Sequence, residues 1–353
     1  MDGMVKAISV AGRGIGPGHP CFIVAEAGVN HNGELEKAFR LVDTAVRAGA
    51  DAVKFQTFTA EQLATCDAPK AGYQVEAMGS AESQFEMLRR LELSAQAHHE
   101  LLAYSRQQGI MFISTPFGED SADLLNELGV AVFKIASGEI TNLPFLAHVA
   151  RKGKPLIIST GMSTLDEVEA AVRVVRDAGS RALVLLHCVS NYPARPSNVN
   201  LRAMETMAAV FRVPVGYSDH TTGIEVALAA VALGACVLEK HVTLDRNLPG
   251  PDHQTSLEPS EFAALVSGIR TVERALGSGR KEPAPSEAET AAVARKSIVA
   301  ARYIPAGSKL TEEMLAVKRP GTGLSPAMRS QLLGRVVSRD IPAGTLLTLD
   351  MMA

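Results

Sequence analysis

The sequence predicts a (β/α)₈ barrel followed by a small, β-rich module. Three observations lead to this prediction. Short apolar runs rich in β-branched residues alternate with amphipathic stretches from Cys21 to about Leu276, a pattern typical of parallel strands joined by crossover helices. A polar stretch rich in glycine and proline follows at 277–285, as in an interdomain linker. The remaining tail repeats one short motif.

The composition indicates a large folded protein without a polymeric partner. Of 353 residues, 46% are hydrophobic and 21% charged, which allows a substantial core. The 35 basic and 38 acidic residues leave a net charge of −3, so we do not expect a nucleic-acid partner. No run approaches the ~20 apolar residues of a membrane span, and no export leader is visible. The four cysteines are far apart, as suits reduced thiols, and we expect a cytoplasmic protein.

Eight runs are predicted to be strands of the barrel. Each is short, continuous and apolar, as expected for strands buried on both faces. The runs are 21–25, 52–55, 111–114, 132–135, 156–159, 183–187, 215–217 and 237–241. Eight strand–helix units in roughly 260 residues match the size of a (β/α)₈ barrel. A doubly wound open sheet alternates similarly, but no G-x-G-x-x-G motif follows an early strand, which disfavours a dinucleotide-binding fold.

Two of the intervening helices have clear end signals. Thr164 and Glu167 have capping-box spacing at the start of an amphipathic stretch, which ends at Gly179. A second amphipathic stretch starts at Pro259 and stops before Gly277. Both stretches are therefore predicted to be crossover helices of the barrel.

Composition changes mark the predicted domain boundaries. Glycines at 12–18 precede the first strand and predict a hairpin, so the barrel domain is predicted to span 1–276. A linker is predicted at 277–291 and a small domain at 292–353. In that small domain Ile304-Pro305-Ala306-Gly307 recurs as Ile341-Pro342-Ala343-Gly344, which indicates internal pseudo-symmetry. A domain of this length would bury only a small hydrophobic core, so we expect it to pack against another protein surface.

Polar residues end all eight predicted strands. In a barrel, the chemistry sits at the carboxyl ends of the strands and in the loops that follow them. Capping or solvation would explain one or two polar strand ends but not all eight. The candidate site residues at or near these ends are Glu26, Lys54, Gln56, Thr115, Lys134, Ser137, Glu139, Ser159, Tyr192, Ser218, His220 and His241.

Two of these residues, His220 and His241, are candidate metal ligands. They end adjacent parallel strands, which lie ~5 Å apart, so their imidazoles can converge. Each alone would more simply be a buried or capping histidine. Two protein nitrogens would leave positions open for water or a substrate oxygen, which suits activation of a carbonyl. By contrast, His98 and His99 are expected on an exposed helix face.

Lys54 and Lys134 predict an anion site. Lysines directed into a barrel mouth are costly unless they meet negative charge. The hydroxyls of Ser137 and Ser159 would complete a cradle for phosphate and carboxylate groups. Salt bridges to nearby glutamates are the competing interpretation, and a Schiff base on either lysine is a third.

Three carboxylates have less specific signals. Glu26 and Glu139 would act as general acid or base if the pocket raises their pKa, or would orient hydroxyl groups. Asp252, on the loop after the eighth strand, would bind a polyol, with a plain turn as the alternative.

These residues lie in motifs that closely resemble the sialic acid synthase family along essentially the whole chain. The tail resembles the antifreeze-like (SAF) domain of that family. The matching segments are 25–33 (AEAGVNHNG), 53–56 (VKFQ), 114–117 (STPF), 134–139 (KIASGE), 159–162 (STGM), 216–220 (GYSDH), 239–241 (EKH) and 250–252 (GPD).

The resemblance implies condensation of phosphoenolpyruvate with an N-acetylated aminosugar, giving a nine-carbon 3-deoxy-2-ulosonic acid and phosphate. A divalent metal is implied at His220 and His241, usually manganese, with magnesium and cobalt as alternatives. Glu26 and Glu139 are implied near the reacting carbons. The residues implied to hold phosphoenolpyruvate are Lys54, Thr115, Lys134, Ser137, Ser159 and Ser218, and those implied to meet the sugar are Gln56, Tyr192 and Asp252.

The resemblance also implies a homodimer in which the SAF domain of one subunit caps the barrel of its partner. Arg319, in the motif 318–321 (KRPG), is the residue that would reach the sugar. Candidate sugars are N-acetylmannosamine, 2,4-diacetamido-2,4,6-trideoxymannose and the altrose isomer that gives pseudaminic acid. The sequence Asp252-His253 disfavours the altrose isomer. A lysine Schiff-base pyruvate aldolase is the alternative enzyme, and a binding protein with an inert barrel is the alternative class.

Overall fold

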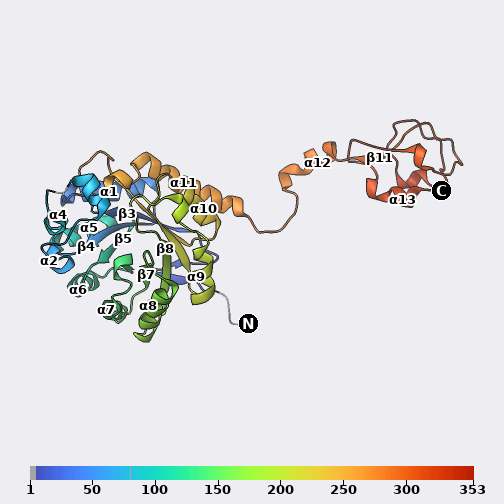
Figure 1. The fold of residues 1–353 in the computed structure, drawn as a ribbon. Helices are drawn as coiled ribbons and strands as arrows, with labels where there is room; N and C mark the ends of the chain where they lie inside the picture. Colours follow the sequence, from blue (N-terminus) through green and yellow to red (C-terminus); the bar gives the residue numbers. More distant parts are fainter. Residues whose placement is uncertain (1–4, 80) are drawn as a thin grey trace. The chain divides into compact units, whose positions relative to one another are not determined.

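The computed structural model describes residues 5–79 and 81–353. The chain divides into two units, Met1–Gly277 and Ser278–Ala353, which Figure 1 shows as a barrel and a small module. Residues 1–4, which the sequence analysis includes in the first domain, lie outside the described residues.

The first unit is built on one parallel sheet of eight strands that forms a nearly closed barrel. The strand order is β5-β4-β3-β10-β9-β8-β7-β6, and the contacts between β5 and β6 complete the ring. The strands are β3 (Phe22–Gly28), β4 (Ala52–Thr57), β5 (Met111–Pro116), β6 (Phe133–Ile135), β7 (Leu156–Ser159), β8 (Leu183–Cys188), β9 (Val215–Asp219) and β10 (Val237–His241). The predicted barrel is confirmed, and each predicted run overlaps one strand, several of which extend beyond the run at the carboxyl end.

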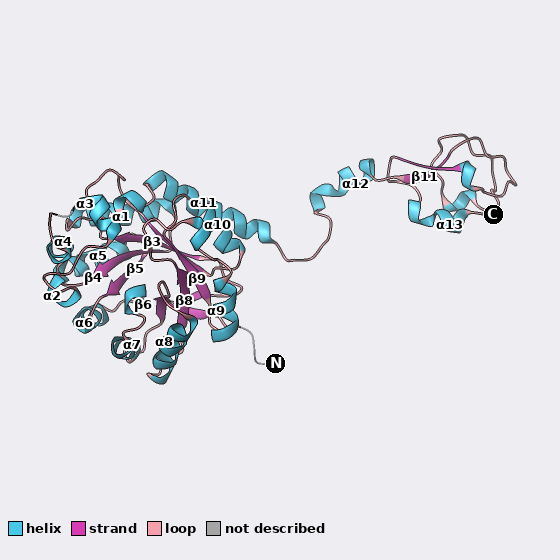
Figure 2. Ribbon diagram, viewed as in Figure 1, coloured by secondary structure: helices cyan, strands magenta, loops and turns pink. Residues whose placement is uncertain are grey.

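Helices surround this barrel (Figure 2). They are α1 (Leu35–Ala48), α5 (Ala95–Gln107), α6 (Glu119–Glu127), α7 (Leu143–Ala150), α8 (Leu165–Asp177), α9 (Ala203–Phe211), α10 (Glu225–Ala232) and α11 (Pro259–Leu276). The two predicted helices are α8 and α11. Thr164 and Glu167 form the expected capping box of α8, since the Thr164 side chain accepts from the Glu167 backbone and Glu167 accepts from the Thr164 backbone.

The barrel has two apolar layers, as the alternation of side chains along each strand requires. One layer packs the outer face of the strands against the helices. The other fills the barrel interior with residues such as Val24, Ile113 and Val184. The hairpin of β1 (Ile8–Val10) and β2 (Arg13–Ile15) buries Val10 and Ile15 in this inner layer. The predicted hairpin thus joins the inner core of the barrel.

One histidine prediction is wrong. His98 on α5 is fully buried, and its Nε2 lies 2.8 Å from Thr57 Oγ1 at the end of β4. Ser94 caps α5, and this start sets the phase of the helix so that His98 faces the sheet while His99 faces solvent. The polar partner at the strand end compensates for burial of the imidazole.

An insertion separates β4 from α5. It contains the short helices α2 (Ala60–Leu63), α3 (Gly72–Met78) and α4 (Gln84–Leu91). Because it follows the carboxyl end of β4, it lies at the end of the barrel where the sequence predicts the site.

The second unit contains α12 (Ala288–Ala294), the antiparallel strands β11 (Ser297–Ala300) and β12 (Leu315–Lys318), and α13 (Arg329–Leu332). Its two Ile-Pro-Ala-Gly repeats pair with each other, because Ile304 and Ile341 exchange two backbone hydrogen bonds of 2.9 Å. The turn glycines are also equivalent: Gly307 N–H donates to the Val337 carbonyl and Gly344 N–H to the Ala300 carbonyl. The predicted pseudo-symmetry is therefore present in the backbone hydrogen bonds. None of the helices in the described part of the chain has the length and hydrophobicity of a membrane span.

Candidate active site

A cavity of about 430 Å³ lies at the carboxyl ends of the barrel strands. Every strand of the barrel contributes at least one lining residue, in most strands from the carboxyl-terminal half. In strand order along the chain these are Glu26, Lys54, Thr115, Lys134, Ser159, Cys188, Ser218 and His241. A larger cavity, of about 580 Å³, lies near the β1–β2 hairpin and α9. We place the site in the first cavity because it contains the buried charged groups.

Four buried charged side chains form a cluster on one side of the cavity. Lys54 Nζ lies 2.7 Å from Glu26 Oε2 and 3.7 Å from Glu239 Oε2. Lys134 Nζ lies 3.3 Å from Glu239 Oε1. The strand register explains the first pair, since Glu26 of β3 lies opposite Lys54 of β4. Two ammonium groups are thus held near the cavity by two carboxylates.

The pKa values of this cluster are shifted by burial and by the neighbouring charges. Burial raises the pKa of Glu26 to about 7, although Lys54 opposes the shift. Burial would also raise the pKa of Glu239, but Lys134 and Lys54 lower it to about 2. For Lys54, the two glutamates outweigh burial and raise the pKa, whereas burial lowers that of Lys134. Glu26 is therefore the carboxyl group that exchanges a proton most readily near neutral pH.

Hydroxyl groups surround the two lysines. Thr115 Oγ1 lies 3.1 Å from Lys54 Nζ, and Ser218 Oγ donates to Glu239 Oε1 at 3.0 Å. Ser137 Oγ accepts from the Gly161 N–H at 2.9 Å. Within the described part of the chain, the buried Ser159 Oγ has no hydrogen-bond partner. Since buried hydroxyls are normally paired, Ser159 is poised to bind an added ligand.

The two candidate metal ligands face each other. The rings of His220 and His241 have centroids 5.4 Å apart. His220 Nδ1 lies 2.8 Å from the Val189 carbonyl oxygen, so Nδ1 donates to it and Nε2 is the nitrogen available to a metal. Burial lowers the pKa of His220, but the neighbouring Cys188 outweighs burial and raises it. His241 Nδ1 is buried and makes no hydrogen bond to any described residue. Burial, with His220 adding to it, lowers the pKa of His241 well below its usual value, so its imidazole is neutral.

This arrangement fits a divalent metal, which binds neutral imidazole nitrogens. Among residues 5–79 and 81–353, no third histidine, cysteine or acidic residue completes a metal-binding group. A metal here would therefore keep positions open for water and substrate oxygens, as catalytic metal sites do.

Comparison with known proteins identifies the family. The NeuB family model matches residues 41–281, and the SAF domain model matches residues 295–353. The chain is a member of the NeuB family.

Relatives of this NeuB family chain cover nearly its whole length. It is 50% identical to the N,N'-diacetyllegionaminic acid synthase of Legionella pneumophila, over 93% of each chain. It is 47% identical to the synthase of the same name from Campylobacter jejuni, over 90% of this chain and 96% of that protein. The mouse N-acetylneuraminate-9-phosphate synthase is 42% identical over 87% of this chain and 85% of its own. The chain is an enzyme of the sialic acid synthase type.

Solved structures agree with the fold. The N-acetylneuraminic acid synthetase from Leptospira borgpetersenii, crystallised with citrate, has a TM-score of 0.72 and 37% identity, over 82% of this chain and 96% of its own. The spore coat polysaccharide biosynthesis protein SpsE from Bacillus subtilis has a TM-score of 0.67 and 38% identity over 99% of both chains.

Three residues predicted to meet the sugar also line the cavity of this NeuB family enzyme. Gln56, Tyr192 and Asp252 all lie in its wall. The Tyr192 ring packs on His220, with centroids 4.1 Å apart. Burial raises the pKa of Asp252 to about 6. Gly28 has a φ of +53°, a backbone conformation that favours glycine. It also lies close to three site side chains, since a Cβ there would be 3.3 to 3.6 Å from Glu26, His241 and Asp252.

Two predicted site residues, Glu139 and Arg319, are not among the residues that line the cavity. Glu139 ends a 3₁₀ turn (Ser137–Glu139) and accepts a hydrogen bond from Asn142 Nδ2 at 2.9 Å, so it points toward the start of α7. Gly138, one residue earlier, lines the cavity instead. Arg319 belongs to the second unit, where its Nε donates to the Ala294 carbonyl at 3.0 Å.

Sequence reasoning omitted Glu239 from the site, although a signal for it exists. Residues i and i+2 of a strand point to the same face, so placing His241 in the barrel interior also places Glu239 there. Lys240, between them, points the other way and pairs with Asp219 Oδ2 at 2.7 Å. The residues of the insertion that line the cavity, such as Tyr73 and Met87, had no such signal, because they follow no strand directly.

Proposed function

We propose that this NeuB family enzyme condenses phosphoenolpyruvate with an N-acetylated aminosugar, releases phosphate, and uses a divalent metal held by His220 and His241. One observation carries the proposal: a single cavity brings two buried lysines next to a pair of facing imidazoles. The lysines suit the phosphate and carboxylate groups of phosphoenolpyruvate. The names of the relatives support a product of the sialic acid type.

The charged side of the cavity would hold phosphoenolpyruvate. Its phosphate and carboxylate need cationic partners and hydroxyl donors in a site shielded from water. Lys54 and Lys134 provide the cations, and Thr115, Ser137, Ser159 and Ser218 provide the hydroxyls. The unpartnered Ser159 Oγ supports this placement, because a phosphate or carboxylate oxygen would satisfy it.

The reaction forms one carbon–carbon bond and breaks one carbon–oxygen bond. C3 of phosphoenolpyruvate attacks C1 of the open-chain aldehyde, whose oxygen gains a proton. Positive charge develops at C2, and water adds there and loses a proton. The C2–O bond to phosphate then breaks as the C2 hydroxyl gives up its proton to the leaving phosphate, leaving the 2-keto acid and inorganic phosphate. The bridging oxygen therefore leaves with the phosphate.

Glu26 would assist at C2. It is buried beside Lys54, and its pKa of about 7 allows it to accept a proton from the attacking water and return it. Glu239 stays ionised between the two lysines and would stabilise positive charge at C2. Glu139 would assist only if its side chain turned away from Asn142.

A divalent metal, with manganese as the expected ion and magnesium or cobalt as alternatives, would act as a Lewis acid on the aldehyde. His220 and His241 would hold it. The hydrogen bond from His220 Nδ1 to the Val189 carbonyl fixes the tautomer that a ligand needs. Tyr192 packs against the His220 ring and keeps its orientation.

Among the candidate sugars, we favour 2,4-diacetamido-2,4,6-trideoxymannose, giving a legionaminic acid. The relatives of 50% and 47% identity are named for that product, whereas a pseudaminic acid synthase from Campylobacter jejuni is 33% identical. N-acetylmannosamine is the alternative, supported by the relative from Leptospira borgpetersenii, which is named for N-acetylneuraminic acid. Gln56, Tyr192 and Asp252 would contact the sugar.

A Schiff-base aldolase is the second candidate function, favoured by one observation. Burial lowers the pKa of Lys134, which makes its amine more nucleophilic. Borohydride reduction in the presence of pyruvate would trap such an adduct on Lys134. The ion pair with Glu239 supports instead a charged Lys134 that binds an anion.

We also propose a homodimer in which Arg319 acts in the partner's barrel. The proposal rests on the family resemblance of 318–321 and on the small core of the second unit. Mixing His220→Ala subunits with Arg319→Ala subunits should restore activity in part, since one mixed site then keeps both residues. Verified subunit exchange without any rescue would contradict the arrangement.

The function is tested with phosphoenolpyruvate labelled with ¹⁸O at the bridging oxygen. Incubation with manganese and each of the three sugars should release phosphate with at least one sugar, and the phosphate should contain the label. Release of unlabelled phosphate would contradict carbon–oxygen cleavage. No release with any of the three would contradict the proposed function.

A further inference from the structure

The insertion between β4 and α5 forms one side of the cavity, and its chemistry differs from that of the charged cluster. Eight residues of the insertion line the cavity, and two of them, Gln74 and Gln84, are polar. The five large apolar or aromatic ones are Leu63, Tyr73, Met87, Leu88 and Leu91. We call these residues the insertion wall. Met87 and Leu91 are buried and pack with Val29 and Phe58 in a small apolar core of their own. The cavity therefore has a charged side and a mainly apolar side, where the two glutamines pair with each other.

Aromatic stacking connects the insertion wall to the histidine pair. The Tyr73 ring stacks on Tyr192 with centroids 4.9 Å apart and an interplanar angle of 29°. Tyr192 in turn packs on His220 at 4.1 Å and lies edge-on to His241 at 5.7 Å. These rings form a continuous surface from the histidines to the insertion. A sugar with its C1 near the histidines would extend along this surface, because phosphoenolpyruvate would occupy the charged side.

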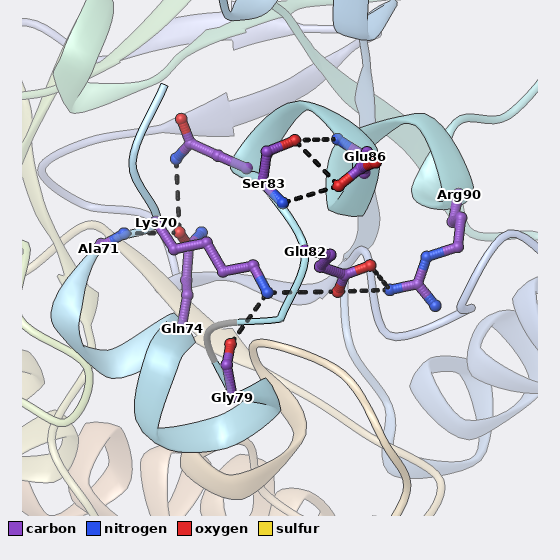
Figure 3. Close-up of polar contacts among 9 residues, drawn as sticks. Lys70, Ala71, Gln74, Gly79, Glu82, Ser83, Glu86 and Arg90 are labelled. Atoms are coloured by element: carbon purple, nitrogen blue, oxygen red, sulfur yellow. Dashed lines mark hydrogen bonds and ion pairs between the residues drawn. The ribbon is translucent and has the colours of Figure 1, made fainter. Parts of the chain in front are cut away.

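Polar contacts hold the insertion in this position (Figure 3). Both carboxylate oxygens of Glu82 accept from Arg90 Nη2, at 2.6 and 2.7 Å, and one also pairs with Lys70 Nζ at 3.3 Å. Lys70 Nζ donates to the Gly79 carbonyl at 3.0 Å as well, and its side chain is only 2% exposed. Glu82 thus links the segment before α3 to α4.

A second set of contacts fixes α3 itself. Gln74 Oε1 accepts from the Ala71 backbone at 2.9 Å (Figure 3). It also accepts from Gln84 Nε2 at 3.4 Å. Gln74 is the residue after Tyr73, so these bonds also fix the backbone that presents the Tyr73 ring. The insertion wall is therefore held in place by the protein's own contacts.

We propose that the insertion wall contacts the end of the sugar remote from C1 and selects a sugar with apolar groups there. This inference rests on the proposed function. The acetamido methyl at C4 and the methyl at C6 of 2,4-diacetamido-2,4,6-trideoxymannose fit against leucine and methionine side chains. N-acetylmannosamine presents hydroxyls at both positions, which would lose their hydrogen bonds to water against such a surface. Pocket contacts of this size discriminate by about 10- to 200-fold.

The test compares kcat/KM for phosphate release with the two sugars in three variants. Leu88 is suited to substitution because it is only half-buried. The wild type should prefer the diacetamido sugar by at least about tenfold. Leu88→Gln should reduce this ratio by about tenfold, mainly through KM for the diacetamido sugar, while Leu88→Met should retain it. Val75→Gln, on an exposed position of α3 outside the insertion wall, is the matched control and should leave the ratio unchanged.

The outcomes separate this inference from the proposed function. If Leu88→Gln changes kcat/KM for both sugars equally, or if the wild type prefers N-acetylmannosamine, the insertion wall does not select the sugar, although phosphate release still supports the proposed function. If none of the three candidate sugars releases phosphate with the wild type, the proposed function itself is wrong. Should Leu88→Gln not fold, as judged by thermal unfolding, Leu88→Thr provides the same comparison with a smaller polar side chain.

Discussion

His220 and His241 face each other across 5.4 Å between ring centroids, at the ends of the neighbouring strands β9 and β10. His241 ends β10, and His220 directly follows β9, whose last residue Asp219 pairs with Lys240, so the distance follows largely from strand spacing. The nearby lysines are held on the same barrel by strands β4 and β6. The proposed metal ligands and the two lysines are therefore positioned by barrel strands and their immediate ends.

Replacing Lys134 with methionine should impair binding of phosphoenolpyruvate. The substitution removes a cation from the cavity and leaves Glu239 with Lys54 as its only lysine partner, at 3.7 Å. We expect KM for phosphoenolpyruvate to rise at least about tenfold and kcat to fall about 100-fold, as for loss of one preorganised charge. Steady-state kinetics measure both. Lys154→Met is the control, because Lys154 bonds to the Val130 carbonyl outside the cavity; equal effects of the two substitutions would contradict the anion site.

Glu26→Gln should reduce kcat and leave the KM of phosphoenolpyruvate nearly unchanged. The amide keeps the size of Glu26 but cannot accept the proton of the attacking water. Loss of a general base typically lowers kcat by about 10² to 10⁴. The exposed Glu34 provides the control variant Glu34→Gln. A kcat within twofold of the wild type would mean that Glu26 only pairs with Lys54.

Acid should destabilise the barrel through buried histidines outside the cavity. Burial lowers the pKa of His31 to about 3 and that of His253 to about 4. In the unfolded chain these histidines become protonated below pH ~6.5. In the folded chain they become protonated only at much lower pH. The stability they contribute is therefore complete above pH ~6.5 and falls as pH decreases, by about 2 kcal/mol for each histidine at pH 5.

Urea unfolding at pH 7 and pH 5 tests this prediction. His253→Gln, which removes the titrating group but keeps a polar partner for Thr243 and Asn32, should lose less stability on acidification than the wild type. His99→Gln, on the exposed face of α5, should behave like the wild type. The same pH dependence in all three proteins would show that His253 already titrates normally in the fold.

The second unit should be equally protected at its two repeats. Ile304 and Ile341 are both buried and donate their amides to each other's carbonyls. Amide hydrogen exchange in the full chain should be slow at both positions and at similar rates. Substitution of either isoleucine by valine should lower the stability of this unit by a similar amount, about 1 kcal/mol. Fast exchange at only one position would contradict the pseudo-symmetric pairing.

The barrel and most of the site follow from local sequence patterns. Strand ends such as Lys54 and His241 are predictable for two reasons. Buried parallel strands appear in the sequence as short apolar runs, and their carboxyl ends all lie at the same end of the barrel. Glu139 shows the limit of that reasoning, since a residue beyond a strand end belongs to a turn whose direction the pattern does not set. His98 shows a related limit, because helix phase depends on the cap at Ser94.

The insertion wall is the part of the site that sequence patterns do not predict. Tyr73 and Leu88 lie on short helices far from any strand end. They reach the cavity because the insertion packs its own apolar core with Val29 and Phe58, while the Lys70–Glu82–Arg90 contacts join its segments. Such contacts between segments depend on the three-dimensional arrangement, so a one-dimensional pattern carries no signal for them.

The central claim is that His220 and His241 hold a metal required for phosphate release. The direct measurement is phosphate release from phosphoenolpyruvate and the diacetamido sugar by chelator-treated enzyme, before and after addition of manganese. We predict no release from the treated enzyme, recovery on addition of manganese, no recovery for His220→Ala, and normal recovery for His99→Ala. Full activity of the metal-free wild type, or full recovery by His220→Ala, would contradict the account.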